Sequence, residues 1–463
     1  MKRVLAAAAT GVLATGIALI APTAGTSAGA TEAAAVTTQP NIIFVLTDDQ
    51  RIDTYETMPT VRNRLRGQGG NYRAIIPTSI CCPSRVSILT GNLAHTTGVY
   101  TNSLDYGGWP TFKASGFEDK TVAVALQDAG YRTGFMGKYL NYWNKAPDGY
   151  APPGWDVFRG FWRDRGQGGG IYYNYELHGT GKDEVFGHDP SDYSANVIKR
   201  KAVSFIKNTP ADTPYFVFIN PTNPHAPYTP APGDVGTWTP KTPYDNAGVN
   251  EENMSDKPAH MQGLPKVARS DINADQIGTG ESLKSVDRLL RAVMDADDMQ
   301  NTLVIYMGDN GVMWGDHRLR YKYRPYRFAT EVPMFMRWDG VIEPGTKGLV
   351  ANIDIAPTLL QAAGVPEAME TEGVSALPAV TRQSVLLEGV SRGRPAYCGI
   401  RSQRYLFVEY PTGERELYDY QTDPYELHNL AYRDAYASMV DSLHQQTVDE
   451  CVPTPPTFSW PDG

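Results

Sequence analysis

Runs of largely apolar residues recur along the chain, and each ends abruptly in a polar cluster. The runs at 41–46, 214–219 and 303–307 are long enough for strands that are buried on both faces of a parallel sheet. A shorter strand is predicted at 131–136, directly after a helix predicted over 121–129. Strands that alternate with helices predict an α/β fold, with a mostly parallel, doubly wound sheet flanked by helices.

Two further parts of the chain depart from this pattern, one in its middle and one after residue 360. Residues 227–275 are rich in Pro, Gly, Asn and Asp, which predicts long surface loops, and a helix is predicted over 283–294. Further on, residues 405–410 and 416–420 flank a Pro-Thr-Gly turn and predict an antiparallel hairpin, followed by a helix over 433–446. These elements predict a smaller C-terminal α+β domain built on an antiparallel sheet.

The N-terminus has the pattern of a secretory signal peptide. Lys2 and Arg3 precede an apolar run at 4–20, and small residues follow up to Ala30. A single membrane anchor is the alternative, but the run is short for a span and rich in Ala and Gly. We therefore predict a secreted protein without stable membrane insertion, divided into a signal peptide (1–30), a flexible lead-in (31–40), a large domain (41–370) and a C-terminal domain (371–463).

The composition is that of a folded globular protein, with 41% hydrophobic and 20% charged residues. The net charge of −9 argues against a nucleic-acid partner. Cys398 and Cys451 are candidates for a disulfide, because an exported protein meets oxidising conditions. Cys81 and Cys82 are adjacent, and neighbouring cysteines rarely bridge each other without strain. At least one of this pair is therefore expected to have a chemical role.

Two polar pairs directly follow predicted strands: Asp48 with Asp49, and Asp309 with Asn310. Open α/β sheets bind their ligands at the carboxyl ends of the strands, where these pairs lie. Oxygen ligands suit a hard divalent cation, Ca²⁺ or Mg²⁺. Taken alone, each pair is better explained as a turn, since Asp and Asn commonly form turns.

The segment from Cys81 to Gly91 decides between these interpretations. It reads Cys-Cys-Pro-Ser-Arg-Val-Ser-Ile-Leu-Thr-Gly. It resembles the signature of the type I sulfatase family, Cys-x-Pro-Ser-Arg followed by Leu-Thr-Gly, at every defined position. The resemblance continues over most of the chain and implies the alkaline-phosphatase-like fold, with residues 41–370 as the catalytic domain. It also implies that a formylglycine-generating enzyme oxidises Cys81 to Cα-formylglycine; a buried or disulfide-linked Cys81 is the alternative.

The resemblance further implies a metal centre, which reverses the preference for simple turns. In this family a single calcium ion is bound by two early acidic residues, a later Asp-Asn pair and the formylglycine itself. At the matching positions of this sequence the implied ligands of Ca²⁺, or of Mg²⁺, are Asp48, Asp49, residue 81, Asp309 and Asn310.

Four further residues match the family's catalytic groups. Arg85 is implied to steady the formylglycine, while Lys138 and Lys322 are implied to bind the sulfate oxygens. His225 matches the histidine that protonates the leaving oxygen, a task that suits an imidazole near neutral pH. Without the family resemblance, the lysines would be interpreted as solvated surface residues and the histidine as a residue that makes a structural hydrogen bond.

The implied reaction is hydrolysis of a sulfate monoester. The aldehyde of residue 81 hydrates to a geminal diol, and the metal lowers the pKa of the attacking hydroxyl. That oxygen attacks sulfur and expels the alcohol, and the second hydroxyl then eliminates sulfate and restores the aldehyde. A serine lacks the second hydroxyl, so it would stop at the sulfated intermediate.

The chain departs from the family pattern after Lys138. Many sulfatases have Trp-His there, whereas this chain has Tyr139-Leu140-Asn141, so Asn141 or another residue must replace that histidine. His95 and His317 also fall at positions that are often histidine in the family, and substrate contact and structural support are equally open for both. The Gly-Lys-Tyr-Leu-Asn segment and the doubled cysteine resemble the branch of N-acetylglucosamine-6-sulfatases and extracellular heparan endosulfatases.

The expected substrate is a sulfated carbohydrate or an aryl sulfate, and the sequence does not decide between them. Aromatic residues in the loops at 145–182 and 227–275 are suited to stacking on sugar or aryl rings. Two other functions remain open. One is a phosphomonoester or phosphodiester hydrolase of the same superfamily, and the other is a non-catalytic glycan-binding protein on a sulfatase scaffold.

Overall fold

The computed structural model describes residues 39–164, 171–391 and 393–461. The predicted signal peptide, and all but two residues of the predicted lead-in, lie outside the described residues. In the part of the chain that is described, no helix is both long and apolar enough to cross a membrane. Residues Gln39–Gly463 form one compact unit, so the domain boundary at residue 370 stays a prediction.

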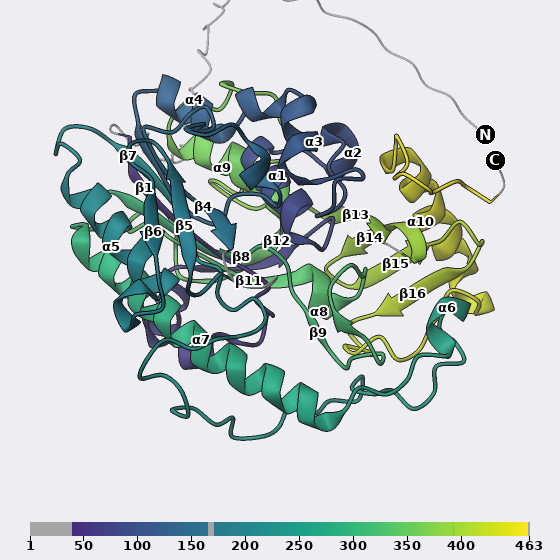
Figure 1. The fold of residues 1–463 in the computed structure, drawn as a ribbon. Coiled ribbons are helices and arrows are strands. Elements are labelled where there is room, and N and C mark those ends of the chain that lie inside the picture. Colours follow the sequence, from purple (N-terminus) through teal and green to yellow (C-terminus); the bar gives the residue numbers. More distant parts are fainter. Residues whose placement is uncertain (1–38, 165–170, 392, 462–463) are drawn as a thin grey trace, which may run out of the picture. The chain divides into compact units, whose positions relative to one another are not determined.

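The apolar runs form the centre of a sheet that has ten strands in the described residues (Figure 1). In spatial order these are β12 (Gly345–Ala351), β2 (Gly70–Ile75), β11 (Glu331–Arg337), β8 (Thr302–Gly308), β1 (Asn41–Thr47), β7 (Tyr215–Asn220), β3 (Arg132–Gly137), β4 (Val157–Asp164), β5 (Tyr175–Gly179) and β6 (Glu184–Phe186). Only β11 and β5 of this described sheet run against the other strands. The prediction of a mostly parallel sheet is confirmed.

Helices cover both faces of this sheet. Ile42, Phe44 and Leu46 of β1 enter one core, together with α1 (Cys81–Thr90), α3 (Gly108–Ala114), α4 (Val122–Asp128) and α9 (Ile355–Ala362). Ile43 and Val45 point to the other face, where α5 (Ser194–Lys207) and α7 (Arg269–Ala296) pack. Successive residues of a strand face opposite sides, so an uninterrupted apolar run is what a strand between two helical layers requires.

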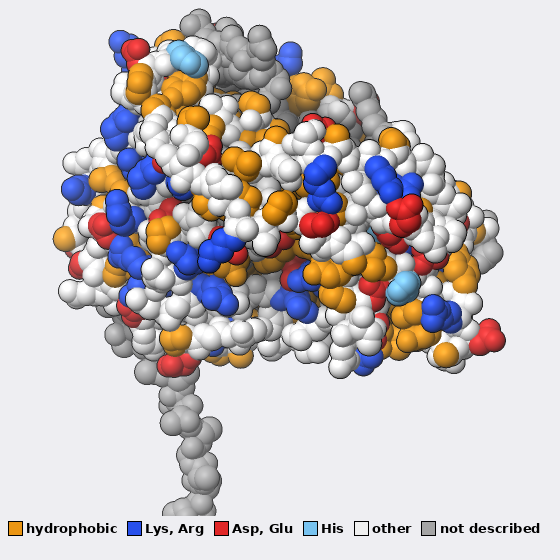
Figure 2. All heavy atoms as spheres, turned by 90° about the horizontal axis from the view of Figure 1, so that it is seen from below, with side chains coloured by type: hydrophobic (Ala, Val, Ile, Leu, Met, Phe, Trp, Pro, Cys, Tyr) orange, Lys and Arg blue, Asp and Glu red, His pale blue; other side chains and the backbone are white. Residues whose placement is uncertain are grey.

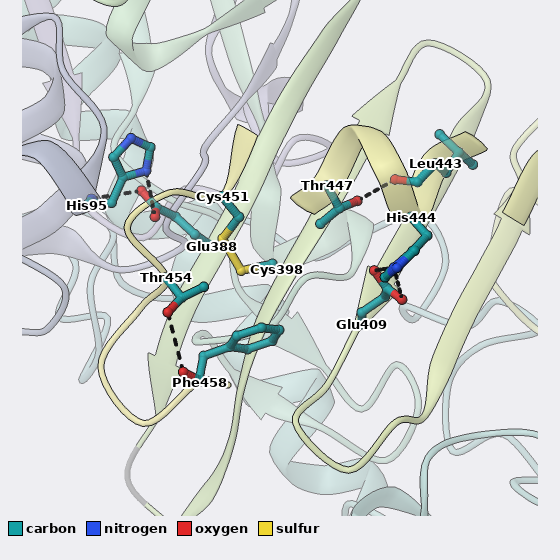
Figure 3. Close-up of a disulfide and its surroundings, with 10 residues drawn as sticks. All are labelled: His95, Glu388, Cys398, Glu409, Leu443, His444, Thr447, Cys451, Thr454 and Phe458. Carbon is teal, nitrogen blue, oxygen red and sulfur yellow. Dashed lines mark hydrogen bonds and ion pairs between the residues drawn. A yellow bond between two sulfur atoms is a disulfide. The ribbon is translucent and has the colours of Figure 1, made fainter. Parts of the chain in front are cut away.

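A second sheet of four antiparallel strands lies near the C-terminus and is drawn in yellow-green in Figure 1. It consists of β13 (Ser384–Ser391), β14 (Arg394–Ser402), β15 (Tyr405–Glu409) and β16 (Arg415–Asp419), and α10 (Ala437–Glu450) packs on it. The predicted hairpin, terminal helix and α+β character are confirmed. The Cys398–Cys451 disulfide joins β14 to the residue after α10, and both cysteines are fully buried (Figure 3).

Short elements complete the described chain. They are α2 (Ala94–Thr97), α6 (Ala259–Gln262), α8 (Arg327–Thr330), β9 (Met313–Trp314), β10 (Arg320–Tyr321), the π-helix η2 (Val61–Arg66), and the 3₁₀ helices η1 (Tyr55–Thr57), η3 (Phe117–Asp119), η4 (Trp143–Lys145), η5 (Pro190–Asp192), η6 (Asn352–Asp354) and η7 (Asp434–Tyr436).

Helix α7 corrects the prediction of loops up to residue 275. It begins at Arg269, well before the predicted start at residue 283. Its first turns contain Asp, Asn and Gly, which are poor helix formers, but tertiary contacts override that preference. Ile272 is fully buried, and a Cβ on Gly280 would meet the Trp238 ring at 2.4 Å. Glycine in this helix therefore permits close packing of the preceding loop.

Candidate active site

The two polar pairs meet at the carboxyl ends of neighbouring strands. Strands β1 and β8 are parallel partners, and their last residues, Thr47 and Gly308, stand opposite each other. Asp48 and Asp309 are the next residues of the two segments, and the amide of Asp49 donates to Asp309 Oδ1 at 3.0 Å. Asn310 Nδ2 donates to Asp49 Oδ1 at 2.8 Å. Because β1 and β8 are neighbours, the two polar pairs are in direct contact.

Cys81 is the first residue of α1, a helix that sequence reasoning did not predict. Ile80 before it is extended, with φ −156° and ψ 151°, so the helix N-terminus opens at Cys81. Its Sγ lies 3.4 Å from Asp48 Oδ1 and 3.8 Å from Asp49 Oδ1. Burial, only partly offset by nearby lysines, raises the pKa of the thiol to about 12. An unmodified Cys81 is thus a protonated thiol at neutral pH and a poor nucleophile.

Arg85, one helical turn after Cys81, is almost fully buried and holds Asp309 in place. Its Nε donates to Asp309 Oδ2 at 2.9 Å, and Nη1 donates to the carbonyl of Lys138 at 2.7 Å and to Asn220 Oδ1 at 3.2 Å. Its Nη2 is buried and has no hydrogen-bond partner. Burial, with repulsion from a neighbouring carboxylate, raises the pKa of Asp309 despite this arginine. Sequence reasoning missed Asn220, although it directly follows the apolar run of β7.

Two lysines reach the carboxylates from separate segments. Lys138 Nζ lies 2.5 Å from Asp48 Oδ2. Lys322 Nζ donates to Asp49 Oδ1 and lies 2.8 Å from Cys81 Sγ. Burial alone would raise the pKa of Asp48 and Asp49, but the surrounding cations outweigh it and lower the pKa of both. Both carboxylates are therefore charged at neutral pH.

His225 faces the same centre from the loop after β7. Its Nε2 lies 3.5 Å from Asp49 Oδ2, and its Nδ1 lies 2.7 Å from the carbonyl of Ala226. A carbonyl only accepts hydrogen bonds, so Nδ1 carries a proton and Nε2 is the nitrogen presented to the centre. The histidine side chain is 25% exposed, so a substrate can reach it.

The donor set is compatible with a divalent cation. Asp48, Asp49, Cys81 and His225 offer ligand atoms within 4.8 Å of one another. The carboxylates are buried, and so is Asn310 Oδ1, which has no hydrogen-bond partner. A buried amide oxygen without a partner is costly, and a cation would satisfy it. Predominantly oxygen ligands favour a hard cation over zinc.

The two other histidines considered from the sequence do not join the centre. His317 is 1% exposed, with Nδ1 2.6 Å from Glu251 and Nε2 3.4 Å from Glu426. His95 lies 3.1 Å from Glu388 (Figure 3) and 3.4 Å from Glu372. Pairs of glutamates thus occupy both nitrogens of each ring, which makes structural support their role.

Two cavities open onto the centre, one of 1920 Å³ on the side of Asp49 and Lys322 and one of 260 Å³ on the side of Asp48 and Lys138. Asn141 lines both, and its buried Oδ1 has no hydrogen-bond partner. The carboxyl end of β4 points down in Figure 1, and the face seen from below is hollowed near its middle, with charged side chains in its walls (Figure 2).

Comparison with known proteins agrees with this geometry. The family model "Sulfatase" matches residues 40–365, and the model "N-sulphoglucosamine sulphohydrolase, C-terminal" matches residues 313–451. The chain therefore belongs to the sulfatase family.

Individual relatives point the same way. The chain is 33% identical to a Caenorhabditis elegans homologue of the extracellular sulfatase Sulf-1, over 74% of this chain but only 50% of that protein. It is 31% identical to human N-acetylglucosamine-6-sulfatase, over 78% of this chain and 69% of that one. The solved structure of BT4656 in complex with D-glucosamine-2-N,6-O-disulfate shares the fold, with a TM-score of 0.72, 22% identity, and coverage of 89% of this chain and 98% of that chain.

Proposed function

We propose that the protein hydrolyses the sulfate ester of a sulfated sugar, with a formylglycine made from Cys81 as its nucleophile. The observation that carries this proposal is the position of Cys81. It begins a helix at the point where two charged carboxylates and Lys322 converge, with Sγ 3.4 Å from Asp48 and 2.8 Å from Lys322 Nζ. Burial keeps the thiol protonated, so the unmodified cysteine is a poor nucleophile and a formylglycine hydroxyl at this position is the better one.

The metal in this proposal is Ca²⁺, or Mg²⁺, held by Asp48, Asp49, Asp309, Asn310 and an oxygen on residue 81. The partnerless Asn310 Oδ1 and the three buried carboxylates support this ligand set. When bound, the metal would lower the pKa of a hydroxyl on residue 81. Cysteine sulfur is a soft ligand, so conversion to formylglycine also makes residue 81 a better match for a hard cation.

The side chains around residue 81 have separate roles in binding the sulfate group and in protonating the leaving group. Lys138 and Lys322 are free to turn to the sulfate oxygens once a metal replaces them on the carboxylates, and they stabilise the charge that redistributes there. The buried Nη2 of Arg85 is a further donor without a partner. His225 presents Nε2 to the centre. Because Nδ1–H is bonded to the carbonyl of Ala226, only the imidazolium form, which is protonated on both ring nitrogens, donates a proton from Nε2 to the leaving oxygen.

A sulfated sugar is supported as the substrate by the relatives. One is an N-acetylglucosamine-6-sulfatase, and BT4656 was solved with a sulfated glucosamine. Secretion is supported by the buried disulfide and by the extracellular sulfatase among the relatives. The proposal also requires one partner protein, the formylglycine-generating enzyme.

Mass spectrometry of the tryptic peptide Ala74–Arg85 tests the modification, and sulfate release from N-acetylglucosamine 6-sulfate tests the activity. We expect the peptide mass of an aldehyde in place of one thiol, and turnover only in modified protein. Cys81→Ser should stop at the sulfated intermediate. Cys82→Ser is the matched control, with the neighbouring buried thiol changed, and should remain active. Full turnover by Cys81→Ser would contradict the mechanism.

The rival functions are separated by two comparisons. A phosphomonoester or phosphodiester hydrolase would turn over an aryl phosphate, or its diester, faster than the matching aryl sulfate. A glycan-binding protein would bind the sulfated sugar without releasing sulfate, even with residue 81 fully modified. Either result would refute sulfate-ester hydrolysis as the function.

A further inference from the structure

The cavity beside Lys322 is larger than a single sulfated ring requires. Its 1920 Å³ exceeds the 300–1,000 Å³ that is common for small-molecule sites. A second cavity of 260 Å³ begins on the opposite side of the centre, and His225 and Tyr142 line both. The leaving group therefore has room to extend from the sulfate in two directions.

Tyrosines with an unusual backbone conformation surround the large cavity. Tyr142, Tyr228, Tyr321 and Tyr323 line it and have φ values of 61°, 60°, 72° and 68°. With Asp49 they make five of the 13 non-glycine residues that have positive φ in the described chain. Bulky L-residues rarely adopt this conformation, which costs about 1–2 kcal/mol each. Such a concentration at one cleft indicates a functional constraint on where these rings lie.

Two of these rings are exposed at the cavity, and each is supported on one side. Tyr321 is 46% exposed and lies next to the catalytic Lys322. The guanidinium of Arg320 covers its ring at 5.2 Å, and Asp275 holds that guanidinium with bonds of 2.8 and 2.9 Å. The exposed face of Tyr321 is thus held in a fixed orientation before any ligand binds.

Tyr142, in the segment that contains Lys138, is likewise exposed at the cavity and supported on one side. It follows Lys138 by four residues and is 40% exposed. Its ring lies against Gly108, where an added Cβ would come within 3.1 Å of Tyr142 Cδ2. Glycine at this position, with φ of 73°, leaves room for the ring.

The charge of the cavity matches an anionic glycan. Lys145 and Arg324 line it in addition to the sulfate-binding Lys322. Asp275 and Glu281 are the acidic side chains of its outer wall in the described residues, and the charge of Asp275 is balanced by Arg320, which also lines the cavity. Aromatic faces next to cations suit sugar rings that carry further sulfate or carboxylate groups.

We propose that Tyr142 and Tyr321 are stacking residues for the sugar rings that flank the sulfated unit, so that the preferred substrate is a sulfated oligosaccharide rather than a monosaccharide. This inference rests on the proposed function for its substrate class. Gly108 leaves room for the ring of Tyr142, and the Arg320–Asp275 pair orients the ring of Tyr321.

The test compares a 6-O-sulfated heparin hexasaccharide with N-acetylglucosamine 6-sulfate. We expect a higher kcat/KM for the hexasaccharide, and we expect Tyr142→Ala and Tyr321→Ala each to lower the ratio of the two values about tenfold. Tyr142→Phe and Tyr321→Phe retain the ring and should keep the ratio. Tyr106→Ala is the matched control, because Tyr106 is 52% exposed with φ of 59° and does not line the cavity.

Binding of the hexasaccharide to a Cys81→Ala protein, which has no hydroxyl to attack sulfur, is measured by calorimetry and separates this inference from the proposed function. The alanine variants should weaken binding about tenfold in this background, and the phenylalanine variants should not. Binding that follows this pattern while modified protein releases no sulfate would refute the hydrolase but support the stacking residues. Unchanged binding in the alanine variants, or equal loss in the alanine and phenylalanine variants, would overturn the inference.

Discussion

Replacement of Arg85 by alanine tests whether the active centre is held together by buried charge. The guanidinium pairs with Asp309, which is fully buried, at 2.9 Å. Removing it leaves a buried carboxylate unpaired, which costs about 3–5 kcal/mol. The carbonyl of Lys138 and Oδ1 of Asn220 also lose their donor, at about 1 kcal/mol each. We therefore expect the free energy of unfolding to fall by about 5–7 kcal/mol.

Urea denaturation in the presence of EDTA measures this loss without a contribution from bound metal. Arg269→Ala is the matched control, because its ion pair with Asp245 has the same 2.9 Å distance but is 45% and 66% exposed. That exposed pair should contribute no more than about 1 kcal/mol. In an Asp309→Asn background no charge is left unpaired, so Arg85→Ala should cost only about 1–2 kcal/mol. Equal losses from the buried and exposed pairs would refute the reasoning.

Three further predictions follow from the structure. The Cys398–Cys451 bridge closes a loop across 53 residues, so replacing both cysteines by alanine should lower the free energy of unfolding by about 4 kcal/mol; a change below about 1 kcal/mol in a urea titration would contradict this. Asn310→Ala should raise the calcium dissociation constant at least tenfold in calorimetry, and unchanged affinity would remove Asn310 from the ligand set. Burial alone would lower the pKa of His317, but hydrogen bonds to two glutamates raise it to about 9. Since this pKa lies above the ordinary value, the stability that His317 contributes is complete below about pH 6.5 and is lost as the pH rises through about 9. The stability difference between the wild type and His317→Gln should therefore shrink between these pH values, and a constant difference would exclude this titration.

The central strands and the polar pairs at their ends could be predicted because their signals are local. A strand covered on both faces must be apolar at consecutive positions, so the runs that became β1, β7 and β8 were recognisable without any partner. Their pairing register was not, because it depends on contacts between distant segments. Local patterns also cannot predict that Lys138 and Lys322 lie at the same group of carboxylates. Only the family resemblance placed both lysines in one site.

Helix α1 and the long helix α7 show what local patterns miss. The segment that begins with Cys81 has no amphipathic periodicity, because every residue of α1 is buried. Pro83 in its first turn and Gly91 at its end, with φ of 70°, were the available signals. In α7, the polar and glycine-rich start has low helix propensity, and packing against Trp238 supplies the missing stabilisation. In both cases tertiary burial outweighs the local preference.

Opposite charges allow several titratable side chains to lie buried at one point, and they would couple a bound metal to the substrate. The buried centre holds three acidic and three basic side chains: Asp48, Asp49, Asp309, Arg85, Lys138 and Lys322. A divalent cation bound by the carboxylates would displace the two lysines and would leave excess positive charge that is costly to bury. An anionic sulfate group would restore the balance, so each should favour binding of the other. Titration of Ca²⁺ in the presence of inorganic sulfate should therefore give a lower dissociation constant than in its absence, and equal values would show that the lysines do not couple the two sites.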